Sequence, residues 1–335
     1  MINIQYKQRD CLAAVIWLAL AVMCVAARPA VADDFPNKPL TMVVGFGVGG
    51  SADRMARAMS SYLADELGQP VKVINKKGAG TLLAANYVLA RPDDGYTIFA
   101  STFSPYLTNT IIEGNAEYTI NDFSYMNFQW FDEELIALSK RSKYKSLPEV
   151  LEAIRTRPKT VRASVVRGSG GHLMAKLLLE VNGIPTDNLN LVTYNSGGQA
   201  RAAVAGGVVD FIVISAKGSE SIREYLNPVA IVSDQPSANW GVPTLNEVLK
   251  PAGVEAPVLP GSIRGYATST AFKRNFPARY DLITSALKKA LENEDLRKLL
   301  DRGEIGRRWI GPERSEAMMT TNFEIIKHYG YLLQH

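Results

Sequence analysis

Short apolar runs alternate with stretches of helical periodicity along most of the chain. Residues 40–45 form a short apolar run with β-branched residues, which predicts a buried strand. A helix is expected next, because apolar residues recur on one face from Met55 to Leu67 and Gly68 can end it. The order strand, helix, strand, helix, strand predicts a largely parallel sheet covered by helices on both faces. The elements expected in this part are strands at 40–45, 71–74 and 96–100 and helices at 52–67 and 82–90.

The same alternation returns in the middle of the chain and predicts a second α/β unit. One more strand is expected at 264–268, followed by terminal helices at 278–292 and 313–333, so we expect the second unit to be inserted into the first. The predicted first lobe comprises residues 33–134 and 257–335, and the second comprises residues 135–256. The second lobe is expected to hold strands at 135–139, 161–166, 191–193, 208–214 and 229–232 and helices that begin near Ser146, His172 and Gly198.

The first 32 residues have the pattern of a secretory signal peptide. Lys7 and Arg9 precede an uncharged apolar run at 11–27, and an Ala-x-Ala site ends at Ala32. We expect export and cleavage after about Ala32. An uncleaved membrane anchor is the alternative, because the apolar run is at the short limit for a membrane span.

Composition limits the chemistry that this chain can perform. The 335 residues carry 37 Lys and Arg against 33 Asp and Glu, a formal net charge of +4, which argues against a basic nucleic-acid grip. Both cysteines, Cys11 and Cys24, lie in the expected signal peptide, so the mature chain should have no disulfide. Only three histidines remain, and no metal-ligand spacing is present, so we expect no metal site.

A strand, a Gly- and Ser-rich turn and a helix follow one another three times, with turns at 45–51, 168–171 and 195–198. A helix N-terminus exposes unpaired N–H groups and a partial positive charge, and glycine lets a ligand approach that backbone. Three such turns at one cleft would bind an anion, most simply a carboxylate or a phosphate. The alternative is that these residues only cap their helices.

Catalytic machinery is hard to assemble from this sequence. Ser169 and His172 share one turn, but no nucleophile elbow is present and no acid is placed to orient the histidine. We therefore interpret His172 as a helix-start residue or a ligand donor. Residues 45–50 match the dinucleotide-binding glycine pattern, but the following strand ends in Asn75 instead of an acid, so we expect no cofactor.

Charged and aromatic residues near the predicted strand ends are further candidates. Arg264 could hold a ligand carboxylate with two hydrogen bonds or form an ordinary ion pair. The acidic segment 132–134 is interpreted as a solvated loop in preference to a catalytic acid pair. Four aromatic residues expected in loops after strands could wall an apolar part of a ligand or pack in the core: Phe103, Tyr106, Trp130 and Phe131.

Several motifs, together and in this order, carry a resemblance to a known family. They are Phe35-Pro-Asn-Lys-Pro-Leu40, Val44-Gly-Phe-Gly-Val-Gly-Gly-Ser-Ala-Asp53, Leu67-Gly-Gln-Pro-Val71, Asp94-Gly-Tyr96, Ser169-Gly-Gly-His172, Tyr194-Asn-Ser-Gly-Gly198 and Gly206-Gly-Val-Val-Asp210. The chain resembles the receptors of tripartite tricarboxylate transporters, also called Bug-type solute-binding proteins, over essentially the whole expected mature chain.

The resemblance implies a fold of the periplasmic-binding-protein type, a Venus flytrap. It implies two lobes, each with a central, mostly parallel sheet flanked by helices, and a ligand cleft between them. The ligand would be a small carboxylate, such as a di- or tricarboxylic acid, an acidic amino acid or an aromatic acid. The partners would be the membrane subunits of a tripartite transporter. We expect a periplasmic monomer with no catalytic residue, no cofactor and no nucleic-acid partner.

The resemblance also implies which residues bind the substrate. Asp53 matches the family's acid inside the first helix, and we interpret its role as mainly structural. Arg264 fits a position that often holds an arginine or an aromatic residue. The expected substrate-binding residues are Gly47, Val48, Gly49, Gly50, Ser51, Asp53, Ser101, Thr102, Ser169, Gly170, Gly171, His172, Ser196, Gly197, Gly198 and Arg264.

The chain departs from the family pattern in two of its turns. Gly47 and Val48 stand where the family usually has prolines, and Gly170 and Gly171 stand where it often has Ser-Pro or Thr-Pro before the histidine. Both changes could alter how the far end of a ligand is held.

The sequence therefore predicts a transport receptor that captures a small carboxylate between two lobes and performs no chemistry. Two alternatives remain at this stage. The protein could deliver its ligand to a signalling partner instead of a permease, or it could be an exported enzyme on the same scaffold, because a fold does not fix a function.

Overall fold

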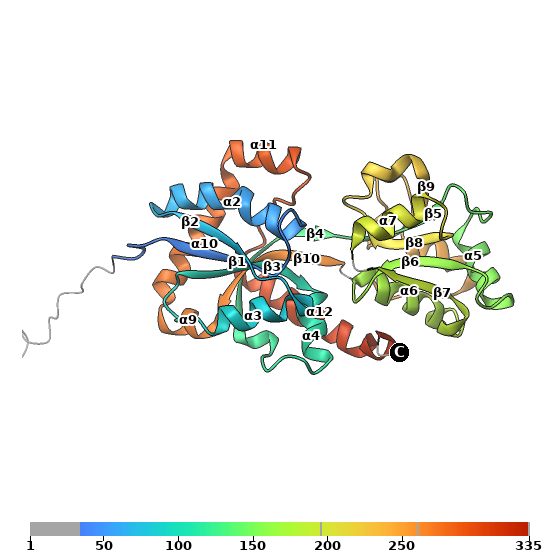
Figure 1. The fold of residues 1–335 in the computed structure, drawn as a ribbon, viewed down its shortest axis with the longest axis horizontal. Helices are drawn as coiled ribbons and strands as arrows, with labels where there is room; N and C mark the ends of the chain where they lie inside the picture. Colours follow the sequence, from blue (N-terminus) through green and yellow to red (C-terminus); the bar gives the residue numbers. More distant parts are fainter. Residues whose placement is uncertain (1–33, 195, 260, 334–335) are drawn as a thin grey trace, which may run out of the picture. The chain divides into compact units, whose positions relative to one another are not determined.

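Two five-stranded sheets organise the computed structural model, which describes residues 34–194, 196–259 and 261–333 (Figure 1). The elements below lie in the unit that begins at Lys38. The expected signal peptide and its cleavage site lie outside the described residues. None of the helices within the described ranges has the length and apolar character needed to cross a membrane.

The first sheet has the strand order β2–β1–β3–β10–β4. The strands β1, β2 and β3 pair in parallel, whereas β10 runs antiparallel to β3 and β4, so four of the five strands point the same way. The strand bounds are β1 (Leu40–Val44), β2 (Val71–Asn75), β3 (Thr97–Ser104), β4 (Phe123–Asp132) and β10 (Ser262–Ser269).

Helices cover both faces of this sheet. On one face α2 packs with α10 and α11, and on the other α3, α4 and α12 pack against β3 and β4 (Figure 1). The helix bounds are α2 (Ser51–Leu67), α3 (Leu82–Leu89), α4 (Tyr106–Ile112), α9 (Thr270–Asn275), α10 (Pro277–Glu292), α11 (Glu294–Arg302) and α12 (Gly311–Tyr329).

The second sheet has the strand order β7–β6–β8–β5–β9, and again four of its five strands run in one direction. Its strands are β5 (Glu134–Ser139), β6 (Arg162–Val166), β7 (Asn190–Tyr194), β8 (Phe211–Ser215) and β9 (Leu226–Val232). Its helices are α5 (Leu147–Thr156), α6 (Gly170–Val181), α7 (Gly197–Ala205) and α8 (Leu245–Leu249).

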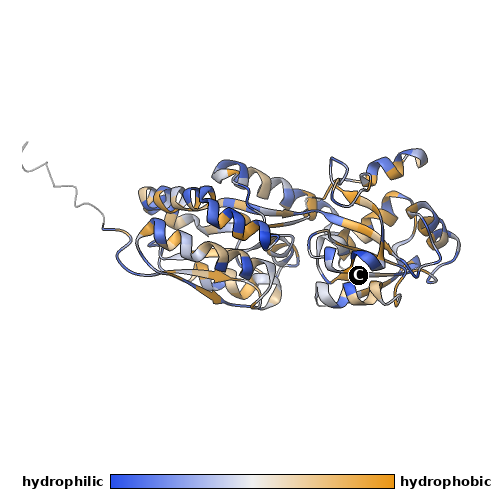
Figure 2. Cartoon of the chain, turned by 90° about the horizontal axis from the view of Figure 1, so that it is seen from above, coloured by the Kyte–Doolittle hydropathy of each residue, from blue (hydrophilic) through white to orange (hydrophobic). Residues whose placement is uncertain are grey.

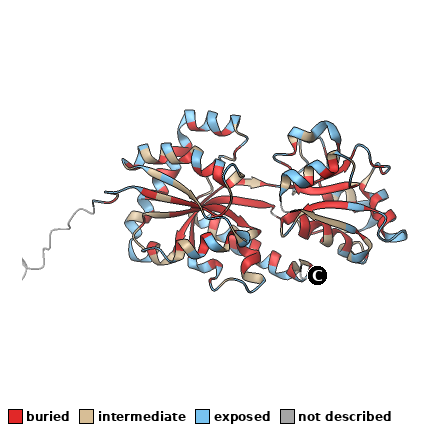
Figure 3. Ribbon diagram, in the orientation of Figure 1, coloured by how far each residue is buried: buried red, intermediate tan, exposed pale blue. Residues whose placement is uncertain are grey.

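Alternation along β5 shows how the strand pattern separates the two faces of the second sheet. Ile136 and Leu138 pack in the core beneath α5 and α6, whereas Leu135 and Ala137 pack in the core beneath α7. Successive side chains of a strand point to opposite faces, so a continuous apolar run serves both cores. Buried strands and exposed outer helix surfaces are visible in Figure 3, and the matching apolar strands in Figure 2.

Three segments connect the two sheets. The strand β4 ends at Asp132 and β5 begins at Glu134, so a single residue joins them. The segment 233–261 leads from β9 back to β10. The helix α12 packs against β4, but Ile326 near its end lies in the core of the second sheet, and so does Leu332 in the 3₁₀ turn η6 (Gly330–Leu333). The division into lobes at 134 and 257 stays a prediction, because the contacts group these residues into one unit.

The elements expected from periodicity are confirmed, apart from shifts of their ends by a few residues. The sequence analysis missed β4, because polar residues such as Asn127 and Gln129 interrupt its apolar pattern although both are fully buried. It was also wrong to place aromatic residues in loops. Phe103 lies in β3, Trp130 and Phe131 lie in β4, and Tyr106 opens α4.

Gly265 tests how tightly the first sheet is packed. A Cβ atom at this position of β10 would lie 2.1 Å from the carbonyl oxygen of Asn127 in β4. We expect Gly265→Ala to lower the free energy of unfolding by about 1–3 kcal/mol, as overpacking does, and to lower Tm. Gly47→Ala is the control for thermal unfolding, because a Cβ there meets nothing within 4 Å. Equal Tm values for the two variants would contradict this packing.

Candidate functional site

The three Gly- and Ser-rich turns meet at one cleft of about 1170 Å³. The turn after β1 contributes residues 46–51, and the turns after β6 and β7 contribute residues 166–169 and 196–198. These turns follow the carboxyl ends of parallel strands, which is where open α/β sheets bind ligands. Two further parts complete the walls of the cleft. One is the junction of β4 and β5, with Trp130, Asp132 and Glu134, and the other is the segment after β8.

The expected site residues divide into those that line this cleft and those that do not. The lining residues among them are Gly47, Val48, Gly49, Gly50, Ser51, Thr102, Ser169, Ser196, Gly197, Gly198 and Arg264. The others, which the structure places behind the cleft wall, are Asp53, Ser101, Gly170, Gly171 and His172.

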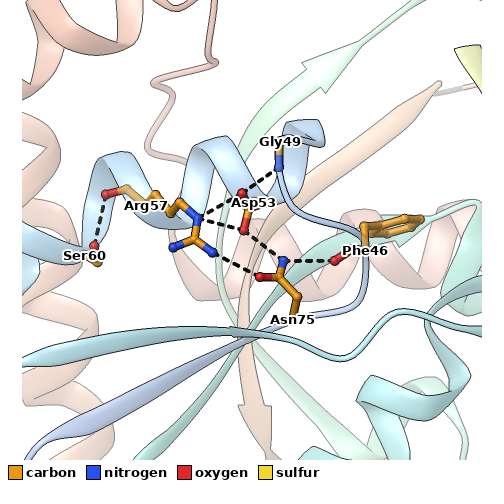
Figure 4. A network of polar contacts seen from close by, with 6 residues as sticks. All are labelled: Phe46, Gly49, Asp53, Arg57, Ser60 and Asn75. Carbon is orange, nitrogen blue, oxygen red and sulfur yellow. Dashed lines mark hydrogen bonds and ion pairs between the residues drawn. The ribbon is translucent and has the colours of Figure 1, made fainter. Parts of the chain in front are cut away.

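Asp53, on α2, fixes the turn after β1 through hydrogen bonds (Figure 4). Its carboxylate accepts hydrogen bonds from the backbone N–H of Gly49 at 2.9 Å, from Arg57 Nε at 2.9 Å and from Asn75 Nδ2 at 2.8 Å. Asn75 Nδ2 also donates to the carbonyl oxygen of Phe46. Burial raises the pKa of Asp53, but these hydrogen bonds and the charge of Arg57 outweigh burial and hold the pKa below its usual value. The residue is therefore an ionised anchor for the turn, in line with the structural role expected for it.

His172 serves the second turn in a similar way. Its Nδ1 accepts a hydrogen bond from the backbone N–H of Gly168 at 3.2 Å, and its own N–H donates to the Ser169 hydroxyl that caps α6. Burial, assisted by the charges of Lys176 and Arg167, lowers the pKa of His172 to about 4. The ring is neutral near pH 7 and is engaged in the turn, so its contribution is to shape the turn.

Arg264 is committed to a buried ion pair. Its Nη1 lies 3.6 Å from Asp132 Oδ2, its Nε donates to the Ser51 hydroxyl at 2.7 Å, and its guanidinium lies over the ring of Trp130. Asp132 Oδ1 in turn accepts from the backbone N–H of Lys217. Arg264 therefore joins the first turn to the end of β4, and Asp132 balances its charge, although Nη1 makes no hydrogen bond within the described residues.

The acidic segment is not the solvated loop that the sequence suggested. Asp132 and Glu134 are 3% and 1% exposed, and only Glu133 between them faces solvent. The physical reason is that Asp132 is the last residue of β4 and Glu134 the first of β5, both in the cleft wall, where Arg264 supplies a counter-charge for Asp132. Both are cleft residues that the sequence analysis missed.

Arg201 was also missed. Its guanidinium donates to the Ser219 hydroxyl and to the carbonyl oxygens of Ser215 and Lys217, all of them neutral acceptors. Within the described residues no carboxylate forms an ion pair with it, so a fixed, half-buried positive charge lines the cleft. A Cβ on Gly197 would lie 2.7 Å from Nη1, so the glycine leaves room for the guanidinium. The i, i+4 spacing of these two residues on α7 was the sequence signal for this placement.

The described part of the chain offers no cluster of three or more His, Cys, Asp or Glu residues that could hold a metal ion. The polar groups that face the cleft include backbone N–H groups, hydroxyls and amides, arginines and a lysine, two buried carboxyls and the carboxylates of Glu113 and Glu304. This donor set suits an organic anion held by hydrogen bonds and charge.

Comparisons with known proteins point to one family. The profile described as "Tripartite tricarboxylate transporter family receptor" (TctC) matches residues 55–318. Protein BugT of Bordetella pertussis is 31% identical over 252 residues, which cover 73% of this chain and 76% of that protein. MatC from Rhodopseudomonas palustris with bound malate shares the fold, with a TM-score of 0.70, 20% identity and coverage of 90% of this chain and 100% of MatC. An R. palustris protein with adipate has a TM-score of 0.69 at 21% identity, covering 90% and 98% of the two chains.

Asp53 gives a prediction for the pH dependence of stability. Its lowered pKa means that its ionised form stabilises the folded state above the unfolded pKa of about 3.9, and that this contribution is lost as the pH falls through the folded pKa. We expect Asp53→Asn to lower the free energy of unfolding at pH 7 by about 1.5–3 kcal/mol, the usual value for hydrogen bonds to a charged group. The difference from the wild type should shrink below pH 4.

Urea titrations at pH 7, 4 and 3 measure this difference. Asp65→Asn is the matched control, because Asp65 lies exposed on the same helix, α2. A loss of stability that stays constant over this pH range would show that the Asp53 carboxylate does not anchor the turn.

Proposed function

Because this chain belongs to the tripartite tricarboxylate transporter receptor family, we propose that it is a periplasmic solute-binding receptor that captures a small carboxylate in the cleft. The proposal includes delivery of the ligand to the membrane subunits of a tripartite transporter. Related proteins support the ligand class, since MatC holds malate and the R. palustris relative holds adipate.

One observation in this chain carries the carboxylate assignment. Arg201 presents a positive charge to the cleft, and its guanidinium donates hydrogen bonds only to neutral acceptors. The acids Asp132, Glu134 and Glu220 act on this charge, but within the described residues none of them forms an ion pair with it. A guanidinium binds a carboxylate through two parallel hydrogen bonds, and such charge-assisted bonds are strengthened where water is excluded. Arg264 does not play this part, because Asp132 already balances it.

The neighbouring turns supply neutral donors for the same group. Ser196, Gly197 and Gly198 begin α7 one turn before Arg201, so backbone N–H groups of that turn lie beside the guanidinium. The first turn, fixed by Asp53, contributes the Ser51 hydroxyl and the start of α2. In this proposal the protein binds and releases its ligand unchanged, and the partial charges of the two helix starts add to the anion affinity.

The test is calorimetry of the protein with a panel of malate, succinate, adipate and benzoate, after unfolding and refolding to remove any bound ligand. We expect at least one acid to bind. We expect Arg201→Gln to weaken that binding at least tenfold, equivalent to about 1.4 kcal/mol, because the counter-charge is lost.

Arg223→Gln is the matched control. The Arg223 guanidinium donates to the carbonyl oxygen of Asn239 and lies outside the cleft, so the affinity should not change. If no acid of the panel binds, or if Arg201→Gln binds as tightly as the wild type, the proposed role of this site is wrong.

A further inference from the structure

Glu134 is a buried carboxyl group at the cleft wall that has no hydrogen-bond partner among the described residues. It is the first residue of β5, it is 1% exposed, and it lines the cleft. Neither of its carboxyl oxygens has a hydrogen-bond partner among the described residues. A buried polar group without a partner costs free energy, so such a group at a cleft wall points to a ligand that completes it.

The turn before α6 is shaped around this carboxyl. A Cβ on Gly170 would lie 2.7 Å from Glu134 Oε1. A Cβ on Gly171 would lie 2.2 Å from the carbonyl oxygen of Val213 in β8 and 3.1 Å from Glu134 Oε2. Gly170 therefore leaves space that the Glu134 side chain fills, whereas Gly171 is set mainly by the close approach of the Val213 backbone.

The carboxyl of Glu134 thus takes the place at the α6 N-terminus where an external carboxylate was expected. The N–H of Gly171 lies close enough to lower the pKa of Glu134 without meeting hydrogen-bond geometry. Of the three turns at the cleft, this one already faces an acid of the protein itself. A ligand carboxylate placed here would meet Glu134 and, beyond it, Asp132.

The charged groups around Glu134 come from several elements. Asp132 ends β4, Arg264 lies on β10, Arg201 lies on α7, and the phenol of Tyr106 lies on α4. Burial and the carboxylate of Asp132 raise the pKa of Glu134 to about 8, against the opposing influence of Arg264 and Arg201. A cation that entered this corner would favour the ionised form of Glu134.

We propose that Glu134 pairs with a protonated amine of the ligand, so that the captured solute is a zwitterion. This inference rests on the proposed function, in which Arg201 and the turn before α7 hold the ligand's carboxylate. An ammonium group has three donors for the two open acceptor oxygens of Glu134. It also brings a positive charge close to the buried carboxylate of Asp132, which would repel a second ligand carboxylate.

The proposal fixes a pH dependence of binding. Near pH 7 the Glu134 carboxyl carries a proton, which is released when an ammonium group binds beside it. The affinity for an amine-bearing ligand should therefore rise from pH 6 to pH 8 and level off above that. The affinity for a dicarboxylate should not rise over the same range.

Two matched series of probes test the proposal. One series is the diacids succinate, glutarate and adipate, and the other is the ω-amino acids in which one carboxylate is replaced by an amine, namely 3-aminopropanoate, 4-aminobutyrate and 5-aminopentanoate. Calorimetry at pH 6 and pH 8, in two buffers of different ionisation enthalpy, gives the affinity and the protons released. We expect an amino acid to bind at least tenfold more tightly than its matched diacid at pH 8, and to release up to one proton at pH 7.

Glu134→Gln keeps the shape of the side chain and cannot ionise. It should weaken binding of the amino acid at least tenfold and abolish its pH dependence, while binding of the diacids stays unchanged or improves. Glu133→Gln, on the exposed neighbour, is the control and should change neither. Thermal unfolding of both variants verifies that they are folded.

The outcomes separate this inference from the proposed function. Tighter binding of diacids, with a loss in Glu134→Gln, would mean that Glu134 acts as a neutral donor to a carboxylate and would overturn the zwitterion. An amino acid that binds equally to the wild type and Glu134→Gln would overturn it too. In both cases sensitivity to Arg201→Gln would leave the receptor proposal standing, whereas no binding by either series would contradict both proposals.

Discussion

The buried ion pair between Arg264 and Asp132 organises the cleft. Arg264 comes from the strand that returns to the first sheet, and Asp132 ends the strand that leaves it. Through the Ser51 hydroxyl and the N–H of Lys217 the pair reaches the first turn and the segment after β8. Removing two charges from water is costly, and these hydrogen bonds offset part of the cost. Arg264 and Asp132 balance each other's charge, although Nη1 of Arg264 makes no hydrogen bond within the described residues, and Arg201 and the carboxyl of Glu134 line the cleft beside this pair.

Apolar periodicity was sufficient to predict most of this fold. The alternation of strands and helices, the serine caps at the starts of α5, α6 and α7 and the glycine that ends α2 are local signals that the structure retains. The strand β4 lacked such a signal. Its polar residues are satisfied by distant partners, as when Asn127 bonds the segment before α12 and Gln129 bonds Gly306, and no local pattern reports bonds of that range.

The parts of the candidate site that backbone turns form could be predicted from the sequence. The parts that depend on buried charged side chains could not. The glycines and serines of the turns could be identified as candidate binding residues because each group directly follows a predicted strand. Asp132 and Glu134 stand in a run of three acids, and that run is typical of solvated loops. Their burial depends on the tertiary structure, because the end of β4 and the start of β5, which belong to different sheets, both lie near Arg264. Arg201 stands out only because the groups that accept its hydrogen bonds are neutral, and their positions depend on the tertiary fold.

The helix α12 has a mechanical consequence for the two sheets. Met319 on this helix lies in the core of the first sheet, and Ile326, two turns later, lies in the core of the second. The other connections between the sheets are the single residue Glu133 and the segment 233–261. Rotation of one sheet against the other therefore has to bend α12 between Met319 and Ile326, or to pull one end of it out of its core. The helix α12 would therefore resist such a rotation, and this resistance comes from the helix itself and not from contacts in the cleft.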